Sequence, residues 1–424
     1  MREDLKERIE KIKRGVVPEG YKRTRVGIIP ESWKICKLSE VCIENGKYGI
    51  NAAACEYKKN LPAYLRITDI DDEGNYIKTN NVCVDSDDSM KYILKENDIV
   101  FARTGGTVGK TYLFNPNDGE LVYAGFLIKF SIDIQKYNKY ILKSYCTTER
   151  YWNWINIMSV RSGQPGVNAE EYSKFTIPIP SMCEQKKIEK VLLLYDEKIK
   201  YKKKVLKEKN KQKKWLMHNL LTSKLRLKGF YGDWKNEKLG KLLLERNEVD
   251  SIESELLSIT GSGIIPRSEI EGKDNSSEDK SKYKKIYIGD IGYNTMRMWQ
   301  GVSAYSSYEG IVSPAYTILK PKDNVDTKFF SYLFKLPSIV FMFYRYSQGL
   351  VDDTRNLKYE NFKKIKVNVP SDIEEQKAIS HILTLADKEI EILQQQIEQI
   401  KLEKKAIMQL LLTGIVRVNQ IGGE

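Results

Sequence analysis

Histidine is the scarcest functional residue type in this sequence. The 424 residues include only two, His218 and His381, and both lie in long helical patterns outside any cluster of possible metal ligands. Histidine is a common zinc ligand and the most frequent general base in enzymes. The composition therefore argues against a zinc site and against histidine-based catalysis.

Paired cysteines and long apolar segments are also absent. The six cysteines form no C-x-x-C motif and none follows Cys183, which favours buried, reduced thiols over a disulfide framework or a metal site. No apolar run is long enough to cross a bilayer, and residues 1–14 alternate charges where a signal peptide would be apolar. We therefore expect a cytoplasmic protein.

Motifs for several catalytic chemistries are incomplete. The stretch Gly105–Thr111 resembles a phosphate-binding loop, but that motif requires glycine where the chain has Thr104, and a strand pattern follows where a helix should begin. We predict instead a turn between two strands. The triplets Glu56–Lys58 and Glu271–Lys273 resemble part of a metal-dependent nuclease site but have no evident partner acid. The sequence contains neither a glycine-rich methyl-donor loop nor an Asn-Pro-Pro-Tyr-like motif, which argues against a methyltransferase on this chain.

The strongest positive feature is an internal repeat of a long helical pattern. Residues from Glu184 to about Leu227 match those from Glu375 to about Val418 with a constant shift of 191. In the second copy apolar residues recur at spacings of four and three, and only Lys404 interrupts this seam. The seam of the first copy is weaker in its middle. Each copy predicts one helix of about forty residues, about 60 Å long.

The ends and charges of these two segments carry further information. Ser181 and Ser371, which follow Pro180 and Pro370, are predicted helix caps. The net charge of the chain is +13, and sixteen Lys/Arg against five Asp/Glu place +11 between residues 184 and 228. Six against seven leave −1 between residues 374 and 417. The basic first helix could be a solvated face, could lie near phosphates, or could pair with the less basic second helix.

The globular segments are repeated along with the helices. A short amphipathic helix, Glu3–Lys13, and a polar arm come first, and the opening Trp33–Leu38 then recurs as Trp234–Leu239. Short strand patterns recur at a shift of 192, including Asp98 against Asp290. The loops between them differ, at 102–107 against 294–299 and at 161–168 against 347–356. One scaffold therefore carries two different sets of polar loops.

These features together resemble the specificity subunit of a type I restriction-modification enzyme over nearly the whole chain. The resemblance rests on Gly27–Trp33, Ile99–Gly105, Ser162–Pro165, Ile177–Pro180 with Glu184-Gln185, and the Leu-Leu-Thr sequences that begin at 220 and 411. The second copy departs from the family pattern at Asn294–Arg297 and Gln348–Val351.

The resemblance implies an α+β fold in which two repeated mixed α/β target recognition domains are joined by two long helices. The helices would form an antiparallel coiled coil with internal pseudo-twofold symmetry. The expected divisions are an N-terminal helix and arm (1–26), recognition domain 1 (27–180), spacer helix 1 (181–228), recognition domain 2 (229–370), and spacer helix 2 with a C-terminal tail (371–424).

The resemblance also implies a non-catalytic DNA-binding role. Each recognition domain would read one half of a bipartite, asymmetric site in double-stranded DNA, and the helices would set the spacing of the halves. Two modification subunits would dock on the chain and methylate adenine N6 with S-adenosylmethionine. Restriction subunits would use ATP and Mg²⁺. All of these cofactors would be bound by the partner subunits, and this chain would bind no cofactor and no metal.

Polar and aromatic residues of the variable loops are the candidate DNA contacts, because such side chains bond base edges and phosphates. In the first domain they are Lys47, Tyr48, Asn51, Arg66, Arg103, Thr104, Lys110, Arg161, Gln164 and Asn168. In the second domain they are Arg267, Arg297, Trp299, Gln300, Gln348, Arg355 and Asn356.

Two other functions stay open on the sequence alone. An autonomous DNA nuclease or NTPase would show metal- or ATP-dependent activity as the purified chain. A coiled-coil adaptor would bind proteins without sequence-selective affinity for DNA, and it would give no reason for two diverged sets of loops.

Overall fold

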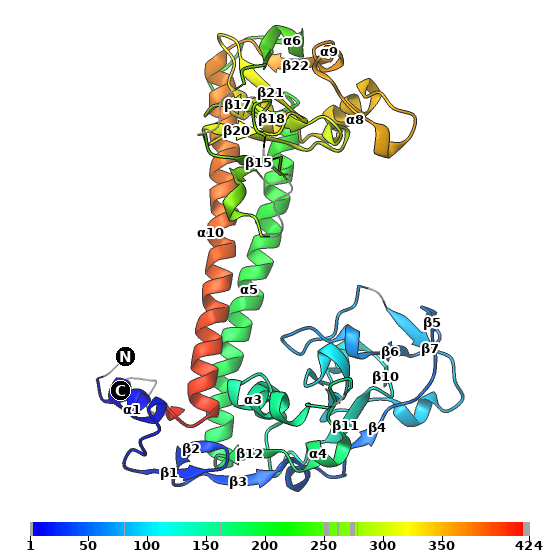
Figure 1. The fold of residues 1–424 in the computed structure, drawn as a ribbon, viewed down its shortest axis with the longest axis vertical. Helices are drawn as coiled ribbons and strands as arrows, with labels where there is room; N and C mark the ends of the chain where they lie inside the picture. Colours follow the sequence, from blue (N-terminus) through cyan, green and yellow to red (C-terminus); the bar gives the residue numbers. More distant parts are fainter. Residues whose placement is uncertain are drawn as a thin grey trace. The chain divides into compact units, whose positions relative to one another are not determined.

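The computed structural model describes residues 3–79, 81–161, 163–249, 254–260, 263–271, 276–277 and 279–418. The chain forms two compact units. Unit 1 comprises residues 1–201 and 397–424, and unit 2 comprises residues 202–396. Each unit contains one globular part and one portion of each long helix, and each is described by itself (Figure 1).

Unit 1 begins with the predicted N-terminal helix and continues as short strands and helices. Its elements are α1 (Glu3–Lys13), β1 (Tyr21–Thr24), β2 (Gly27–Pro30), β3 (Lys34–Lys37), β4 (Lys47–Tyr48), β5 (Ala54–Glu56), β6 (Ala63–Leu65), β7 (Val82–Val84), β8 (Asp98–Ala102), β9 (Thr111–Leu113), β10 (Leu121–Tyr123), β11 (Leu127–Ser131), α2 (Lys139–Tyr145), α3 (Glu149–Met158), α4 (Ala169–Ser173) and β12 (Thr176–Ile179). The long helix α5 (Met182–Leu220) starts in this unit.

Unit 2 repeats much of this order. Its elements are β13 (Trp234–Lys238), α6 (Leu239–Leu242), β14 (Leu243–Arg246), β15 (Leu257–Ile259), β16 (Ile264–Pro266), β17 (Lys284–Ile286), β18 (Ile291–Asn294), β19 (Ser303–Tyr305), β20 (Gly310–Val312), β21 (Tyr316–Pro321), α7 (Thr327–Leu333), α8 (Pro337–Tyr346), α9 (Tyr359–Phe362) and β22 (Lys366–Pro370). The second long helix, α10 (Ile373–Leu412), starts here and ends in unit 1.

The two units share one sheet plan. Unit 1 has an antiparallel four-stranded sheet of order β4-β11-β8-β9, and unit 2 has its counterpart, β14-β21-β18-β19. A two-stranded sheet joins the entry of each globular part to the strand before the long helix, as β3 with β12 and β13 with β22. The predicted fold class, a repeated mixed domain with two long helices, is confirmed.

A buried aspartate lies at the start of equivalent strands in the two units, Asp98 at the start of β8 and Asp290 directly before β18. Asp98 accepts hydrogen bonds from the Ser131 hydroxyl at 2.5 Å and the Lys95 backbone N–H at 2.9 Å. Asp290 accepts two hydrogen bonds from the Arg246 guanidinium, at 2.8 and 3.1 Å. Asp290 also accepts from the Tyr287 backbone N–H at 3.0 Å. The backbone contact three residues before the aspartate is therefore repeated in both units, whereas the side-chain donor differs.

The long helices end earlier than the repeat in the sequence indicates. The predicted ends were Leu227 and Val418, but α5 ends at Leu220 and α10 at Leu412. Left-handed residues follow, Ser223 with φ +57° and Gly414 with φ +71°, and a residue in that conformation cannot continue a right-handed helix. The conserved spacing of the two copies beyond these points reflects a repeated turn.

One of the two predicted helix caps is correct. The Ser181 hydroxyl accepts a hydrogen bond from the Glu184 backbone N–H at 3.3 Å, as an N-cap does. The prediction for Ser371 was wrong, because its hydroxyl donates to the Asp233 carbonyl oxygen at 3.1 Å. The cap of α10 is Asp372, whose carboxylate accepts from the Glu374 backbone N–H at 2.9 Å.

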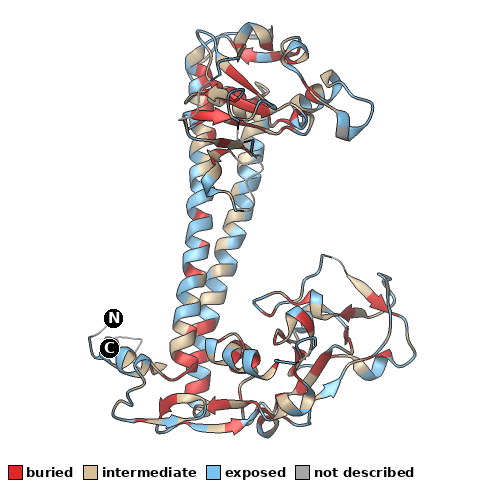
Figure 2. Ribbon diagram, in the orientation of Figure 1, coloured by how far each residue is buried: buried red, intermediate tan, exposed pale blue. Residues whose placement is uncertain are grey.

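The two long helices pack antiparallel in both units. In unit 1, Ile188 and Leu192 of α5 share a core with Met408, Leu411 and Leu412 of α10. In unit 2, residues near the end of α5 share a core with residues near the start of α10, namely Leu220, Leu221, Ile379 and Leu383. Figure 2 shows that burial along α5 concentrates at its ends, with a largely exposed or half-buried stretch between them.

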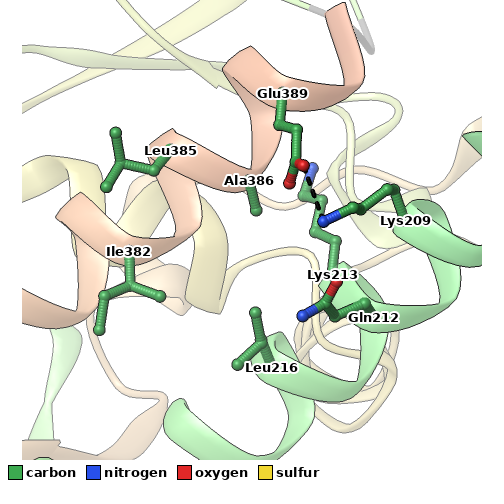
Figure 3. Close-up of a pocket in the computed structure, with 8 residues that line it drawn as sticks. All are labelled: Lys209, Gln212, Lys213, Leu216, Ile382, Leu385, Ala386 and Glu389. Atoms are coloured by element: carbon green, nitrogen blue, oxygen red, sulfur yellow. Dashed lines mark ion pairs between the residues drawn. The ribbon is translucent and has the colours of Figure 1, made fainter. Parts of the chain in front are cut away.

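Lysines replace apolar residues in the weaker part of the seam and pair with α10. In unit 2, Lys202 donates to Gln396 at 2.7 Å, Lys209 pairs with Glu389 at 2.7 Å, and Lys213 pairs with Asp387. A shallow groove remains between the helices there, lined by Lys209, Gln212, Lys213, Leu216, Ile382, Leu385, Ala386 and Glu389 (Figure 3). The basic α5 thus pairs with the less basic α10 through these three lysines.

Each unit is fastened by a buried glutamate at the start of a long helix. In unit 1, Glu184 accepts from the Trp33 indole N–H at 2.9 Å and from Arg417 at 2.5 and 2.8 Å. In unit 2, Glu375 accepts from Trp234 at 3.3 Å and from Arg226 at 2.7 and 3.0 Å. We call each set a Trp–Glu–Arg lock. It joins the domain entry, the start of one helix and the turn after the other.

A second repeated contact holds helix α2 of unit 1 and helix α7 of unit 2 against the helix pair. The Tyr140 hydroxyl donates to Asp196, which also pairs with Lys404 at 2.6 Å. In unit 2 the Tyr332 hydroxyl donates to Asp387 at 2.6 Å, and Lys213 pairs with the same carboxylate. Burial, reinforced by the adjacent carboxylate, raises the pKa of both tyrosines, so they remain donors. The lysine that interrupts the apolar seam, Lys404, therefore has a specific partner.

The prediction of buried, reduced cysteines is correct for four of the six. Cys36, Cys42, Cys83 and Cys146 are buried free thiols, and burial raises the pKa of Cys36 and Cys42 to about 12. Cys183 is exposed and Cys55 half-buried, so the prediction of burial was wrong for these two. Within the described part of the chain, no helix is long and apolar enough to span a membrane.

We predict that Arg417→Ala destabilises the protein by roughly 2–4 kcal/mol, because it leaves the buried Glu184 carboxylate without its countercharge. Urea unfolding monitored by circular dichroism measures the change. The matched control is Lys401→Ala in α10, which breaks a surface pair with Glu398 and should change stability by less than about 0.5 kcal/mol. Equal losses in the two variants would contradict the role of the lock.

Candidate nucleic-acid interface

In unit 1, tertiary structure joins the two loops that the sequence presents separately. The loop after β8 and the loop before α4 are linked by the Val167 N–H to the Arg103 carbonyl oxygen at 2.9 Å and the Gly105 N–H to the Pro165 carbonyl oxygen at 3.0 Å. Gly105 has φ +74°, which favours glycine. The candidate residues Arg103, Thr104 and Gln164 therefore lie in one surface region.

The segment Gly105–Thr111 is a turn between strands, as predicted. A single 3₁₀ turn, η4 (Gly105–Thr107), follows β8 and leads into β9, which pairs with β8. A phosphate-binding loop requires the N-terminus of a helix to face the anion. In this part of the chain a strand stands in that place, so the structure does not support a nucleotide site here.

An arginine stacked on a tyrosine lies at the edge of this loop region. The guanidinium carbon of Arg103 is 4.8 Å from the ring centroid of Tyr48, a cation–π distance. The Tyr48 hydroxyl accepts from the Ala169 N–H at 3.2 Å, and the Arg103 N–H donates to the Phe126 carbonyl oxygen at 3.0 Å. Tyr48 remains 43% exposed. The pair is thus both fixed in place and open to a ligand.

Four other candidates of unit 1 are engaged in internal contacts. Arg66 makes a bidentate pair with the buried Asp69 at 2.9 and 2.8 Å. Arg161 makes a bidentate pair with Glu171 at 2.6 and 2.7 Å. Asn168 caps α4, and Lys110 pairs with Asp72 at 2.8 Å. A DNA contact by any of these four side chains would compete with a bond that supports the fold.

The remaining candidates of unit 1 are more available. Lys47 is exposed, and its only ion pair in the described structure is with the exposed Glu44 at 2.5 Å. Asn51 and Gln164 are exposed, and their side chains make no hydrogen bond to the described residues. Thr104 donates a long hydrogen bond to Pro165 at 3.4 Å. These four side chains can turn toward a ligand at little cost.

Unit 2 brings the corresponding loops together by equivalent bonds. The Leu357 N–H donates to the Thr295 carbonyl oxygen at 2.8 Å, which joins the segment after β18 to the loop before α9. Gln348 and Asn356 exchange two backbone hydrogen bonds of 2.8 Å each and close that loop at its neck. The same pair of loops, at the same place on the sheet, therefore forms the candidate surface in both units.

An aromatic cluster with one arginine forms the centre of the unit 2 surface. The Arg355 guanidinium carbon is 4.0 Å from the ring centroid of Tyr344, and Arg355 pairs with Asp352 at 3.0 Å. Trp299 meets Tyr344 edge-on at 6.3 Å, and Phe341 stacks on Tyr344 at 6.5 Å. Sequence reasoning named Trp299 and Arg355 but missed Tyr344 and Phe341. The exposed face of the helix that contains them could have indicated both.

The other candidates of unit 2 fall into two groups. Arg297, Gln300 and Gln348 are exposed, and their side chains have no hydrogen-bond or ion-pair partner among the described residues. Arg267 lies in the 3₁₀ turn η6 (Arg267–Glu269) and donates to the Ile270 carbonyl oxygen at 2.8 Å. The Asn356 side-chain oxygen is buried and has no hydrogen-bond partner among the described residues, although the side-chain amide N–H donates to the Thr354 carbonyl oxygen at 3.3 Å.

Candidate metal ligands do not gather in the described structure. Its histidines, cysteines and carboxylates form no group of three that could hold a metal ion. Of the two nuclease-like triplets, Glu56–Lys58 has Glu56 in β5 and Lys58 3.7 Å from Asp85. Gly272 and Lys273 of the other triplet lie outside the described residues, as do Ser162 of the loop motif and residues 419–424.

We predict that truncating an internally paired arginine lowers the stability of the fold, whereas truncating an exposed, unpaired one does not. Arg66→Ala should cost roughly 2–3 kcal/mol of stability, because it strands the buried Asp69 carboxylate. Arg297→Ala should stay within about 0.5 kcal/mol, since the side chain is exposed. Thermal unfolding of both variants measures this. A loss of 2 kcal/mol in Arg297→Ala would show that the exposed guanidinium supports the fold.

Comparisons with known proteins agree with this geometry. The family model described as type I restriction modification DNA specificity domain matches residues 30–211 and again residues 231–402. A protein of Methanocaldococcus jannaschii, provisionally named the type I restriction enzyme MjaX specificity subunit, is 26% identical over 94% of this chain and 97% of its own. The MjaVIII specificity subunit of the same organism is 28% identical over half of each chain.

Two solved structures share the fold. A chain from a structure on complex assembly and conformational transition of the type I R-M system aligns with a TM-score of 0.56 at 16% identity, over 92% of this chain and 99% of that one. The S subunit of a type I system from M. genitalium aligns with a TM-score of 0.50 at 14% identity, over 89% and 95%. The family model matches both copies of the repeat, and the chain belongs to the family of DNA specificity subunits of type I restriction-modification systems.

Proposed function

We propose that each unit reads one half of a bipartite, asymmetric site in double-stranded DNA. The observation that carries this proposal is that one sheet plan presents a joined pair of loops in both units, with different residues in each pair. Identical readers would suit a symmetric site. Two different readers suit two different half-sites, since bases are distinguished by the side chains that reach their edges.

The proposed contacts divide by the availability of the side chains. Direct contacts to bases or phosphates are assigned to the more available candidates, Lys47, Tyr48, Asn51, Arg103, Thr104 and Gln164 in unit 1 and Arg297, Trp299, Gln300 and Gln348 in unit 2. Arg66, Lys110, Arg161, Asn168, Arg267, Arg355 and Asn356 would support the loops, and would contact DNA only by exchanging an internal bond. The first group should therefore determine the recognised sequence.

The long helices would set the spacing of the half-sites and dock the partner subunits. The proposed partners are two modification subunits that methylate adenine N6 with S-adenosylmethionine, and restriction subunits that use ATP and Mg²⁺. The chain itself would be non-catalytic, bind no cofactor and act in the cytoplasm. The proposed recognition domains span residues 27–180 and 229–370, and the proposed spacer helices lie within 181–228 and 371–424.

The first test is the methylation pattern produced by the chain with its modification subunit. Co-expression followed by single-molecule sequencing for N6-methyladenine should give a split motif with a fixed gap. We predict that Arg103→Ala relaxes or weakens reading of one half-site only, by about fivefold or more, because a bidentate base contact contributes roughly 1–3 kcal/mol.

The matched variant for that experiment is Arg297→Ala, which should act on the other half-site. Equal loss at both halves in either variant would contradict the assignment of one unit to one half. A stable complex that leaves no methylated motif would favour the adaptor alternative. Metal- or ATP-dependent cleavage by the purified chain would favour the nuclease or NTPase alternative.

We further predict that inserting one heptad into each long helix changes the permitted gap between the half-sites. Seven residues extend a helix by about 10 Å and keep the apolar seam in phase. At about 3.4 Å per base pair, this corresponds to about three base pairs. Methylome sequencing reports the gap directly. A gap that stays at its original length would refute the spacer role, provided that the variant remains folded.

A further inference from the structure

Several apolar side chains lie in the segments that form the candidate surface of unit 2. We call Met296, Trp299, Phe341, Tyr344, Leu350 and Val351 the apolar patch. Leu350 is 99% exposed, Val351 59% and Phe341 57%. Scattered exposed apolar residues are ordinary, but a group at a proposed binding surface calls for a function. Trp299 is half-buried, and the other five side chains are exposed within the described structure.

The loop that carries Leu350 and Val351 is held closed. Its neck is the pair of backbone hydrogen bonds between Gln348 and Asn356. Inside it, the Thr354 N–H donates to the Val351 carbonyl oxygen at 3.0 Å. Gly349 has φ +130°, and a Cβ there would lie 2.6 Å from the Thr354 carbonyl oxygen, so only glycine fits. Two apolar side chains are therefore presented to solvent by a braced loop.

The rest of the patch stands on a packed base. Helix α8 lies against the 3₁₀ turn η7 (Met298–Gln300), and the Trp299 indole N–H donates to the Met296 carbonyl oxygen at 2.9 Å. Tyr344 lies between Trp299, Phe341 and the Arg355 guanidinium. Arg297 and Arg345, in the same segments, are exposed cations. The patch thus combines a fixed apolar centre with positive charge beside it.

This combination fits the major groove of DNA. Burying apolar side chains against phosphates or base-edge acceptors would strip those polar groups of water without replacing their hydrogen bonds. In the major groove, the apolar group of a base edge is the C5 methyl of thymine. The neighbouring arginines suit the flanking phosphates. The positive charge and the apolar surface therefore both indicate the major groove of DNA as the partner.

We propose that the apolar patch of unit 2, in which Leu350 is the most exposed side chain, reads thymine methyl groups in one half-site. The inference rests on the proposed function and adds the chemical group that is recognised. A half-site methylated on adenine holds at least one thymine, opposite the target base, so the group that the patch would read is present in every such half-site.

The test is a double-mutant cycle between the protein and the DNA, with the full chain in complex with its modification subunits. Each thymine of the mapped site is replaced in turn by deoxyuridine, which lacks only the C5 methyl. We expect at least one position in a single half-site to lose about fourfold in binding, the effect of one buried methyl group. In Leu350→Ala or Phe341→Ala the same replacement should change binding by less than about twofold.

The matched control is Ile288→Ala, which removes an exposed apolar side chain just before the start of β18, whereas the patch residues Met296 and Trp299 follow the end of that strand. This variant should keep the full fourfold effect of deoxyuridine. If deoxyuridine has the same effect in the wild type and in both patch variants, the inference about thymine is overturned. The proposed function would still be supported in that case, provided that the complex methylates a split motif. Reduced retention of the modification subunit by the patch variants would identify a protein-docking surface and also overturn it. If the wild-type complex methylates no motif, both proposals fall together.

Discussion

The buried glutamate at the start of each long helix is the interaction on which the architecture depends. A carboxylate taken out of water must be compensated by a countercharge and by donors, or the unit that contains it loses several kcal/mol. Glu184 and Glu375 obtain this compensation from an entry tryptophan and from an arginine beyond the end of the other helix. Each lock therefore requires three segments that are distant in the sequence to come together, and so fixes how the globular part of the unit packs on the helix pair.

The second repeated contact explains a feature that weakens the helix pair locally. Lys404 and Lys213 occupy seam positions where an apolar residue would contribute more to stability. Each instead pairs with an aspartate that also accepts a hydrogen bond from a tyrosine, Tyr140 of α2 or Tyr332 of α7. A polar residue at a seam position disfavours other registers. Stability given up in the seam thus serves to fix register.

The candidate surface is built on a different principle. Backbone hydrogen bonds join the two loops in each unit, whereas their side chains differ almost completely. The scaffold can therefore stay constant while the recognised chemistry changes. In unit 1 the surface centres on an arginine stacked on Tyr48, and in unit 2 on an aromatic cluster with a braced apolar loop.

The sequence by itself determined the duplication, the two long helices and the family, because periodicity and repeated spacing are local and survive without knowledge of tertiary contacts. It also placed the loops that form the candidate surface. Only the tertiary structure decided which residues of those loops are available. Arg66 and Arg297 look alike in the sequence, but one is held by a buried aspartate and the other is exposed. Tyr344 was missed because its role depends on neighbours up to forty-five residues away. The helix ends likewise depended on left-handed turns at Ser223 and Gly414, which the apolar pattern does not encode.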